Sequence, residues 1–137
     1  MENTLVIIKP DAVAAGHTEE IVRMIEVAGL TIEWWDKIRP SRELIEAHYA
    51  EHVGKPFYED LCTFMTGGNV VYLLVEGEDA VQRMRDLAGT TDPKGWKPGT
   101  IRHRFGTSIS RNAVHASDSV AACDRELKAY MNDGESD

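Results

Sequence analysis

Two short runs of aliphatic and β-branched residues constrain the fold of this chain more than any other feature. The run 69–75 is the stronger, and the run 4–9 ends immediately before Pro10. Apolar runs of this length that are rich in β-branched residues are typical of strands buried in a sheet. The sequence therefore predicts at least two buried strands and a fold that contains a β-sheet.

Helical periodicity accounts for most of the remaining chain. Apolar residues at helical spacing, together with capping residues and glycine stops, predict helices over 19–28, from Ser41 onward, over 57–65, from an N-cap at Asp79 to 88, and over 120–131. Further strands are expected at 30–38 and at 105–109. The expected order is strand, helix, strand, two helices, strand, helix, long loop, strand, helix.

This order contains two strand–helix–strand units with split pairing. It indicates an α+β fold, a ferredoxin-like antiparallel sheet (split βαβ) covered by helices on one face. A doubly wound parallel sheet is the competing architecture, but it needs a more regular alternation and longer strands. The 137 residues show no internal repeat or long linker, so we expect a single domain over 1–137. The segment 89–104, rich in proline and glycine, is expected to be a functional loop.

The distribution of charge says more about binding than its total. The net charge of −8 disfavours sequence-independent nucleic-acid binding, which needs an extended cationic face. The segment 83–111, however, has seven basic and two acidic residues, a net of +5 against −13 elsewhere. A basic segment in an acidic protein suggests a pocket for a small polyanion, although from charge alone a solvated charge run is the commoner explanation.

The apolar runs and the cysteines restrict the class of protein further. No apolar run approaches the roughly 20 residues of a membrane span, and the N-terminus lacks the organisation of a signal peptide. We therefore expect an intracellular, cytoplasmic protein. Cys62 and Cys123 have no metal-ligand spacing and no C-x-x-C motif, so they are expected to be reduced and buried.

Three features are candidates for chemistry. The chain has no Walker-type phosphate loop and no G-x-G-x-x-G, so side chains would have to bind any phosphate. Lys9 follows the first strand and either extends to solvent or points into a cleft. Arg102 lies in the basic loop, and its planar guanidinium suits phosphate oxygens. His115 precedes the last helix, where one ring nitrogen can be oriented while the other acts as a nucleophile, although a lone histidine is more often structural.

Four motifs resemble one enzyme family. They are T-L-V-I-I-K-P-D at 4–11, H-Y-A at 48–50, K-P-G-T-I-R at 97–102 and R-N-A-V-H-A-S-D-S at 111–119. In this order, collinear from Thr4 to about Met131, they are similar to the nucleoside diphosphate kinase family. The resemblance implies an enzyme that transfers the γ-phosphoryl group of a nucleoside triphosphate, typically ATP, to a nucleoside diphosphate and so maintains NTP and dNTP pools.

The resemblance also implies roles for individual residues. His115 would be the nucleophile of a ping-pong reaction and become a phosphohistidine, with Glu126 holding its imidazole. The nucleotide would be bound by Lys9 and Asn112 at the sugar and the transferred group, Tyr49 at the transferred group, Arg85, Thr91 and Arg102 at the other phosphates, and Phe57 and Ile109 at the base. Mg²⁺ would arrive with the β- and γ-phosphates, and Asp118 would reach it through water.

The chain departs from the family pattern in two places. The residue after the nucleophile is usually glycine in the family and is Ala116 here, a change that we expect to be tolerated. The chain also ends soon after its last helix, whereas longer family tails contribute to subunit contacts, so the resemblance implies a homo-oligomer without deciding between tetramer and hexamer. Two rival functions remain: a nucleotide-binding regulatory module without turnover, and a histidine phosphocarrier that exchanges phosphate with proteins.

Overall fold

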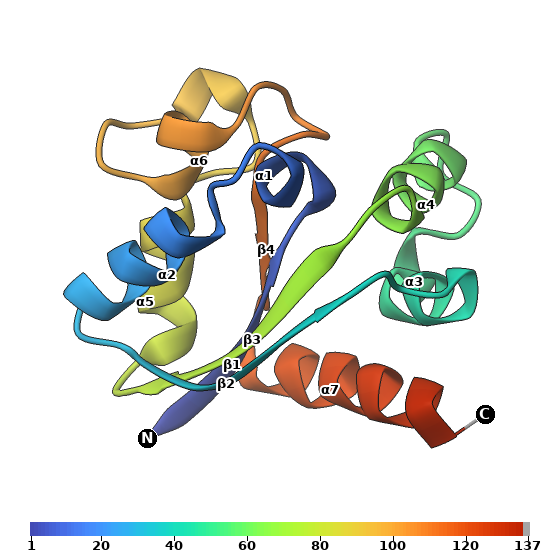
Figure 1. Ribbon diagram of the computed structural model, residues 1–137, viewed down its shortest axis with the longest axis horizontal. Coiled ribbons are helices and arrows are strands. Elements are labelled where there is room, and N and C mark those ends of the chain that lie inside the picture. Colours follow the sequence, from blue (N-terminus) through green and yellow to red (C-terminus); the bar gives the residue numbers. More distant parts are fainter. Residues whose placement is uncertain (136–137) are drawn as a thin grey trace.

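An antiparallel sheet of four strands organises the molecule (Figure 1). The computed structural model describes residues 1–135. The strands are β1 (Glu2–Ile8), β2 (Thr31–Ile38), β3 (Val70–Gly77) and β4 (Val114–Ala116), in the spatial order β2-β3-β1-β4. Every neighbouring pair is antiparallel. The predicted ferredoxin-like α+β arrangement is therefore confirmed.

The helices join these strands in the expected order. They are α1 (Pro10–Ala14), α2 (Thr18–Val27), α3 (Arg42–His48), α4 (Tyr58–Thr66), α5 (Ala80–Ala88), α6 (Ile101–Phe105) and α7 (Val120–Glu135), with 3₁₀ turns η1 (Ala50–His52) and η2 (Pro93–Gly95). Two short helices, α1 and α6, are present in addition to those predicted. Ser41 caps α3, because its side chain accepts a hydrogen bond from the Leu44 amide at 3.0 Å. Asp79 occupies the N-cap position of α5 but makes no side-chain capping bond.

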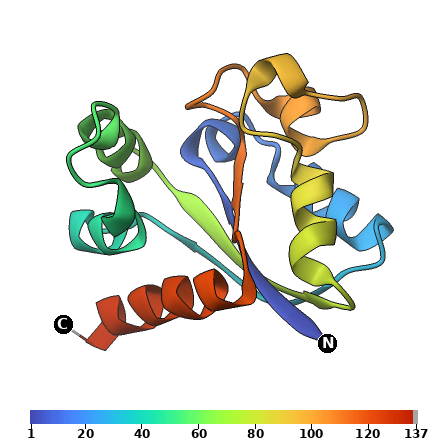
Figure 2. The ribbon, with the colours of Figure 1, turned by 180° about the vertical axis from the view of Figure 1, so that it is seen from behind.

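Helices cover both faces of the sheet, not one face as predicted. Val6 and Ile8 of β1 pack into one core with α2 and α5, whereas Leu5 and Ile7 pack into a second core with α3, α4 and α7. Figure 2 shows the two groups of helices on opposite sides of the strands. The sequence of β1 explains this arrangement. Its apolar residues are continuous rather than alternating, as in a strand that is buried on both faces, so both faces of the sheet are covered by helices.

The predicted strand at 105–109 is wrong. Phe105 ends α6 and the following residues are irregular, while the fourth strand is Val114–Ala116 and contains His115. Three residues are too few for a period-2 pattern, and β4 exists because it pairs with β1 along Val6–Ile8. The segment 89–104 is also not structureless, since it contains η2 and the start of α6.

Two further expectations can be compared with the structure. Cys62 and Cys123 are both buried and unbridged, as expected. Within residues 1–135 no helix is both long enough and apolar enough to cross a membrane.

Candidate active site

A cavity of about 1430 Å³ is lined by residues of α4, α5, α6 and β4 and of the loops beside them. Its walls include all eleven side chains that the sequence nominated: Lys9, Tyr49, Phe57, Arg85, Thr91, Arg102, Ile109, Asn112, His115, Asp118 and Glu126. These residues come from segments between the first strand and the last helix, so only the tertiary fold brings them together. The cavity is large enough for a nucleotide-sized ligand.

His115 is held by one ring nitrogen. It lies on β4 opposite Ile7 of β1, and its Nε2 is 3.3 Å from both carboxylate oxygens of Glu126 on α7. An ionised carboxylate can only accept a hydrogen bond, so Nε2 carries the proton and donates it. His115 Nδ1 has no hydrogen-bond partner within residues 1–135, and in this tautomer it presents a lone pair.

Glu126 is buried and ionised. Burial acts to raise the pKa of this carboxyl, but the hydrogen bond and charge of His115, the nearby His48 and the Ser117 hydroxyl together hold it below its usual value. The Ser117 Oγ donates to Glu126 Oε1 at 2.6 Å and receives a bond from the Leu5 amide at 3.2 Å. Ser117 therefore connects the carboxylate to the backbone of β1, a role that the sequence did not reveal because a serine at this position also fits a helix start.

Lys9 points into the cavity, which decides between the two orientations left open by its sequence position. Its Nζ donates to Asn112 Oδ1 at 2.9 Å, and its amide donates to the Ala113 carbonyl at 2.8 Å. Burial, followed by the positive charge of Arg102, lowers the pKa of Lys9 to about 8. A desolvated ammonium group beside a second cation is poised to meet an anion.

Two arginines add to this positive charge. Arg102 donates from its guanidinium to the carbonyls of Gly89, at 2.6 Å, and Val114, at 2.9 Å, which fixes it beneath the cavity. Burial and the neighbouring Arg85 lower the pKa of Arg102. Arg85 forms an ion pair with Asp118. Arg85 and Arg102 thus bring charge of the basic segment to the cavity, where Lys9 from the end of β1 adds to it. This supports the polyanion pocket over the solvated charge run.

Apolar side chains stand at the entrance. Phe57 and Ile109 line the cavity and are 49% and 60% exposed. The Asn112 side-chain amide donates to the Ile109 carbonyl at 3.1 Å and so ties the entrance to the polar interior. A flat aromatic face and an aliphatic side chain at the mouth are suited to hold a planar ring.

A second histidine lies directly behind the first and was not nominated as a site residue. His48 on α3 packs edge-on against His115, with ring centroids 4.6 Å apart, and also against Tyr49. Burial, then the proximity of His115, lowers the pKa of His48 to about 3, so the ring is neutral near pH 7. Burial also raises the pKa of Tyr49. In the sequence, only the H-Y-A motif drew attention to this residue.

Ala116, where the family usually has glycine, sits in extended backbone opposite Val6. In the described part of the chain the non-glycine residues with positive φ are Asp79 and Ala113, so position 116 does not require glycine's conformational freedom. Ala113, at φ 76°, is the residue in the left-handed region, and its amide donates to Asp11 Oδ2 at 3.1 Å.

The chain is similar to known proteins over almost its whole length. A family model described as Nucleoside diphosphate kinase matches residues 2–136. The chain is 48% identical to a nucleoside diphosphate kinase of Pyrococcus abyssi, covering 98% of this chain and 86% of the relative. It is 42% identical to one of Staphylococcus aureus, covering 98% and 91%.

Solved structures agree with the sequence relatives. An apo nucleoside diphosphate kinase from Encephalitozoon cuniculi superposes with a TM-score of 0.92 at 34% identity, covering 96% of this chain and 89% of that one. A halophilic nucleoside diphosphate kinase from Halobacterium salinarum, solved in complex with CDP, superposes with a TM-score of 0.90 at 39% identity, covering 94% and 86%.

Proposed function

The chain belongs to the nucleoside diphosphate kinase family, and we propose that His115 is the nucleophile through which it works. The enzyme transfers the γ-phosphoryl group of a nucleoside triphosphate to a nucleoside diphosphate by way of a phosphohistidine. The observation that carries the assignment of His115 is its environment. Nε2 donates to a buried, ionised carboxylate, while Nδ1 has no hydrogen-bond partner among the described residues and lies in a cavity lined by cations.

In the first half-reaction, His115 Nδ1 attacks the γ-phosphorus. The Nδ1–P bond forms as the bond from phosphorus to the β–γ bridging oxygen breaks, and the nucleoside diphosphate leaves with that electron pair. Positive charge develops on the imidazole, and Glu126 stabilises it through the proton that stays on Nε2. In the second half-reaction the β-phosphate oxygen of an acceptor diphosphate attacks the same phosphorus, and Nδ1 recovers its lone pair.

The cations supply most of the remaining catalysis. Lys9, with Asn112, is assigned to the transferred group and the ribose, and Tyr49 to the transferred group. Arg85, Thr91 and Arg102 are assigned to the other phosphates. Because phosphoryl transfer leaves little covalent work beyond the nucleophile, fixed charges aimed at the phosphate oxygens lower the barrier.

Phe57 and Ile109 are assigned to the base. Stacking between an aromatic and an aliphatic side chain uses the faces of the ring, which every nucleobase has, and few of its edges. The entrance therefore favours broad base tolerance, with ATP as the usual donor.

The donor set around the cavity fits a magnesium ion that binds with the nucleotide. Mg²⁺ prefers one or two carboxylates, substrate phosphates and its own waters. Asp118 supplies one exposed carboxylate beside Arg85, and we assign it to the ion through water. Bound there, Mg²⁺ would neutralise charge on the β- and γ-phosphates.

We also propose the domain organisation, the oligomeric assembly and the cellular location of the protein. Residues 1–137 form one domain. The chain assembles into a homo-oligomer, a tetramer or hexamer, and this proposal is supported by the edge strand β2, on which Trp35 is exposed, and by the exposed Val27 at the end of α2. The location is cytoplasmic, where nucleoside triphosphates are used.

Labelling tests the nucleophile directly. The protein is incubated with γ-labelled ATP and magnesium, freed of nucleotide, and chased with unlabelled GDP, beside a His115→Ala variant. We expect an acid-labile, base-stable label that requires His115 and moves to GTP. Equal labelling of His115→Ala would show that another residue is the nucleophile, and binding of ATP without any label would favour the regulatory module. Label that passes to proteins but not to GDP would favour the phosphocarrier.

A further inference from the structure

Three potential metal ligands meet beneath the cavity. One nitrogen of His48, one nitrogen of His115 and a carboxylate oxygen of Glu126 all lie within 4.8 Å of one another. They come from α3, β4 and α7. In the described part of the chain, no other three His, Cys, Asp or Glu side chains are grouped in this way. We propose that these three side chains form an inhibitory binding site for Zn²⁺, separate from the magnesium that accompanies the nucleotide.

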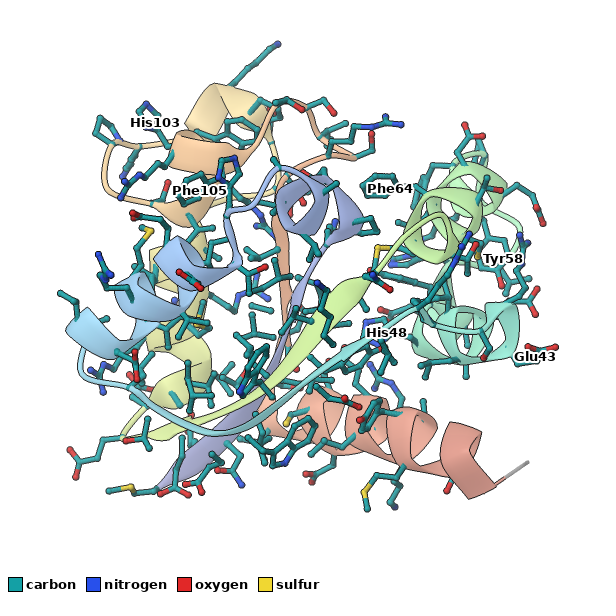
Figure 3. The ribbon with its side chains drawn as sticks, in the orientation of Figure 1. Glu43, His48, Tyr58, Phe64, His103 and Phe105 are labelled. Atoms are coloured by element: carbon teal, nitrogen blue, oxygen red, sulfur yellow. The ribbon has the colours of Figure 1, made fainter. Side chains whose placement is uncertain are left out.

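His48 supplies an observation independent of the clustering. Its side chain is 1% exposed, yet neither ring nitrogen has a hydrogen-bond partner among the described residues. A buried polar group without a partner costs free energy, and such an exception needs an explanation. Figure 3 shows His48 on the side of α3 that is turned toward the sheet. A metal ion between the two imidazoles would give this ring the partner that it lacks.

Two of the three separations between ligand atoms are close to those of a zinc site. His115 Nε2 lies 3.3 Å from Glu126 Oε2, and His48 Nε2 lies 3.9 Å from the same oxygen. Ligand atoms around a tetrahedral zinc are roughly 3.4 Å apart, because each lies about 2.1 Å from the metal. One pair already has this separation, and the second needs to close by about half an ångström. The third pair, between the two histidine nitrogens, lies within 4.8 Å and needs the larger adjustment. The cavity, which all three residues line, provides an entry path and an open coordination position.

The chemistry of the donors selects the metal. Two imidazoles and one carboxylate are a recurrent ligand set for Zn²⁺, whereas Mg²⁺ prefers oxygen ligands and gives up its waters reluctantly. Burial disfavours the charged form of an imidazole, so His48 is available with a free lone pair. The proposed site therefore discriminates between zinc and the magnesium of the reaction.

Zinc at this site would stop phosphoryl transfer, a consequence that rests on the proposed role of His115. The catalytic tautomer has its proton on Nε2 and its lone pair on Nδ1. Coordination of Nε2 moves that proton to Nδ1, which then has no lone pair with which to attack phosphorus. The same ion takes the Glu126 oxygen that otherwise stabilises the imidazolium. Magnesium would not relieve this inhibition, but a chelator would.

Cobalt binding tests the site without nucleotide or turnover. The whole protein is titrated with Co²⁺, whose visible absorption reports imidazole ligation in a low-coordinate site, and Zn²⁺ is then added to displace it. We expect one equivalent to bind, and His48→Gln and His115→Gln each to weaken binding roughly tenfold or more, since even outer-shell partners of a metal change its affinity by that much. Two variants keep the test valid if one of them does not fold.

His52→Gln is the matched control. This histidine lines the same cavity, and its Nε2 lies 3.7 Å from Glu51 Oε1, but it does not belong to the group of His48, His115 and Glu126. It should bind Co²⁺ like the wild type. Unchanged affinity in both cluster variants, or loss of binding only in His52→Gln, would overturn the site. If cobalt binds as expected but zinc does not slow phosphoenzyme formation, the site stands and the proposed tautomer chemistry of His115 is wrong.

Discussion

The Glu126→Gln substitution isolates the charge that stabilises His115. The carboxylate is buried and accepts from His115 Nε2 at 3.3 Å and from Ser117 Oγ at 2.6 Å. Glutamine keeps the shape and one accepting oxygen, but it removes the negative charge and introduces an NH₂ group that can donate to Nε2. Donation to Nε2 favours the tautomer with a proton on Nδ1, which cannot act as the nucleophile.

The size of the effect follows from the bond that is lost. A hydrogen bond to a charged group contributes about 1.5–3 kcal/mol. Since about 1.4 kcal/mol corresponds to a tenfold change in rate, phosphorylation of His115 should slow by roughly 10- to 150-fold. Glu126 is assigned to the imidazole and not to the nucleotide, so the affinity for ADP should stay within about twofold of wild type, well under 1 kcal/mol.

Single-turnover rapid quench with labelled ATP measures the phosphorylation step, and calorimetry measures ADP binding. Glu59→Gln is the matched control, because it makes the same substitution at an exposed glutamate that pairs with Arg42. It should react at the wild-type rate. A Glu126→Gln enzyme that phosphorylates within about threefold of wild type, less than 1 kcal/mol, would refute the electrostatic role of this carboxylate.

Three further predictions concern pH and backbone. Because Lys9 loses its charge as pH rises through about 8, the kcat/KM of the free enzyme should fall along an alkaline limb near that value, and Lys9→Arg should lack the limb even if it is slower. The pKa of His48 is lowered from 6.5 to about 3, so between these pH values the imidazole binds a proton in the unfolded chain but not in the folded protein. Thermal melts should therefore show stability falling as pH decreases through this range, and falling less steeply in His48→Gln. Ala116→Gly, in extended strand backbone, should cost about 0.5–1 kcal/mol in urea melts, whereas Ala113→Gly, at φ 76°, should cost measurably less because it relieves strain.

The parts of the fold that could be predicted are those with a local signal. The runs at β1 and β3 carry enough β-branched and aliphatic residues to identify them, and amphipathic spacing identifies α2, α5 and α7. β4 has no such signal, because it is three residues long and is held by pairing with β1 rather than by its own pattern. Phe105 and Ile109 look like strand residues, but Thr100 caps α6, which ends at Phe105, by accepting a hydrogen bond from the His103 amide.

The site divides in a similar way. The residues nominated by motif resemblance all line one cavity, which the spacing of those motifs alone could not have shown. Ser117 and His48 lie within the quoted motifs but were not assigned to the site, for different reasons. A serine before a helix has an obvious local use as a cap, and a histidine on the apolar side of a helix is usually structural. The contact of Ser117 with Glu126 spans 9 positions of the sequence, and the contact of His48 with Glu126 spans 78. No local pattern encodes the longer of the two contacts.

The concentration of charge in an otherwise acidic protein has a physical consequence in the cavity. Lys9 and Arg102 are both desolvated and repel each other, and the pKa of each is lowered by burial and by a neighbouring cation. Arg85 is paired with Asp118, and the Lys9 ammonium group donates to the neutral oxygen of Asn112. A polyphosphate would satisfy all three cations at once, so part of its binding energy comes from relieving this repulsion. Because Arg102 is already held by two backbone carbonyls and Lys9 by Asn112, these two cations need little reorganisation as charge moves during transfer. This is the condition under which fixed cations lower a barrier most.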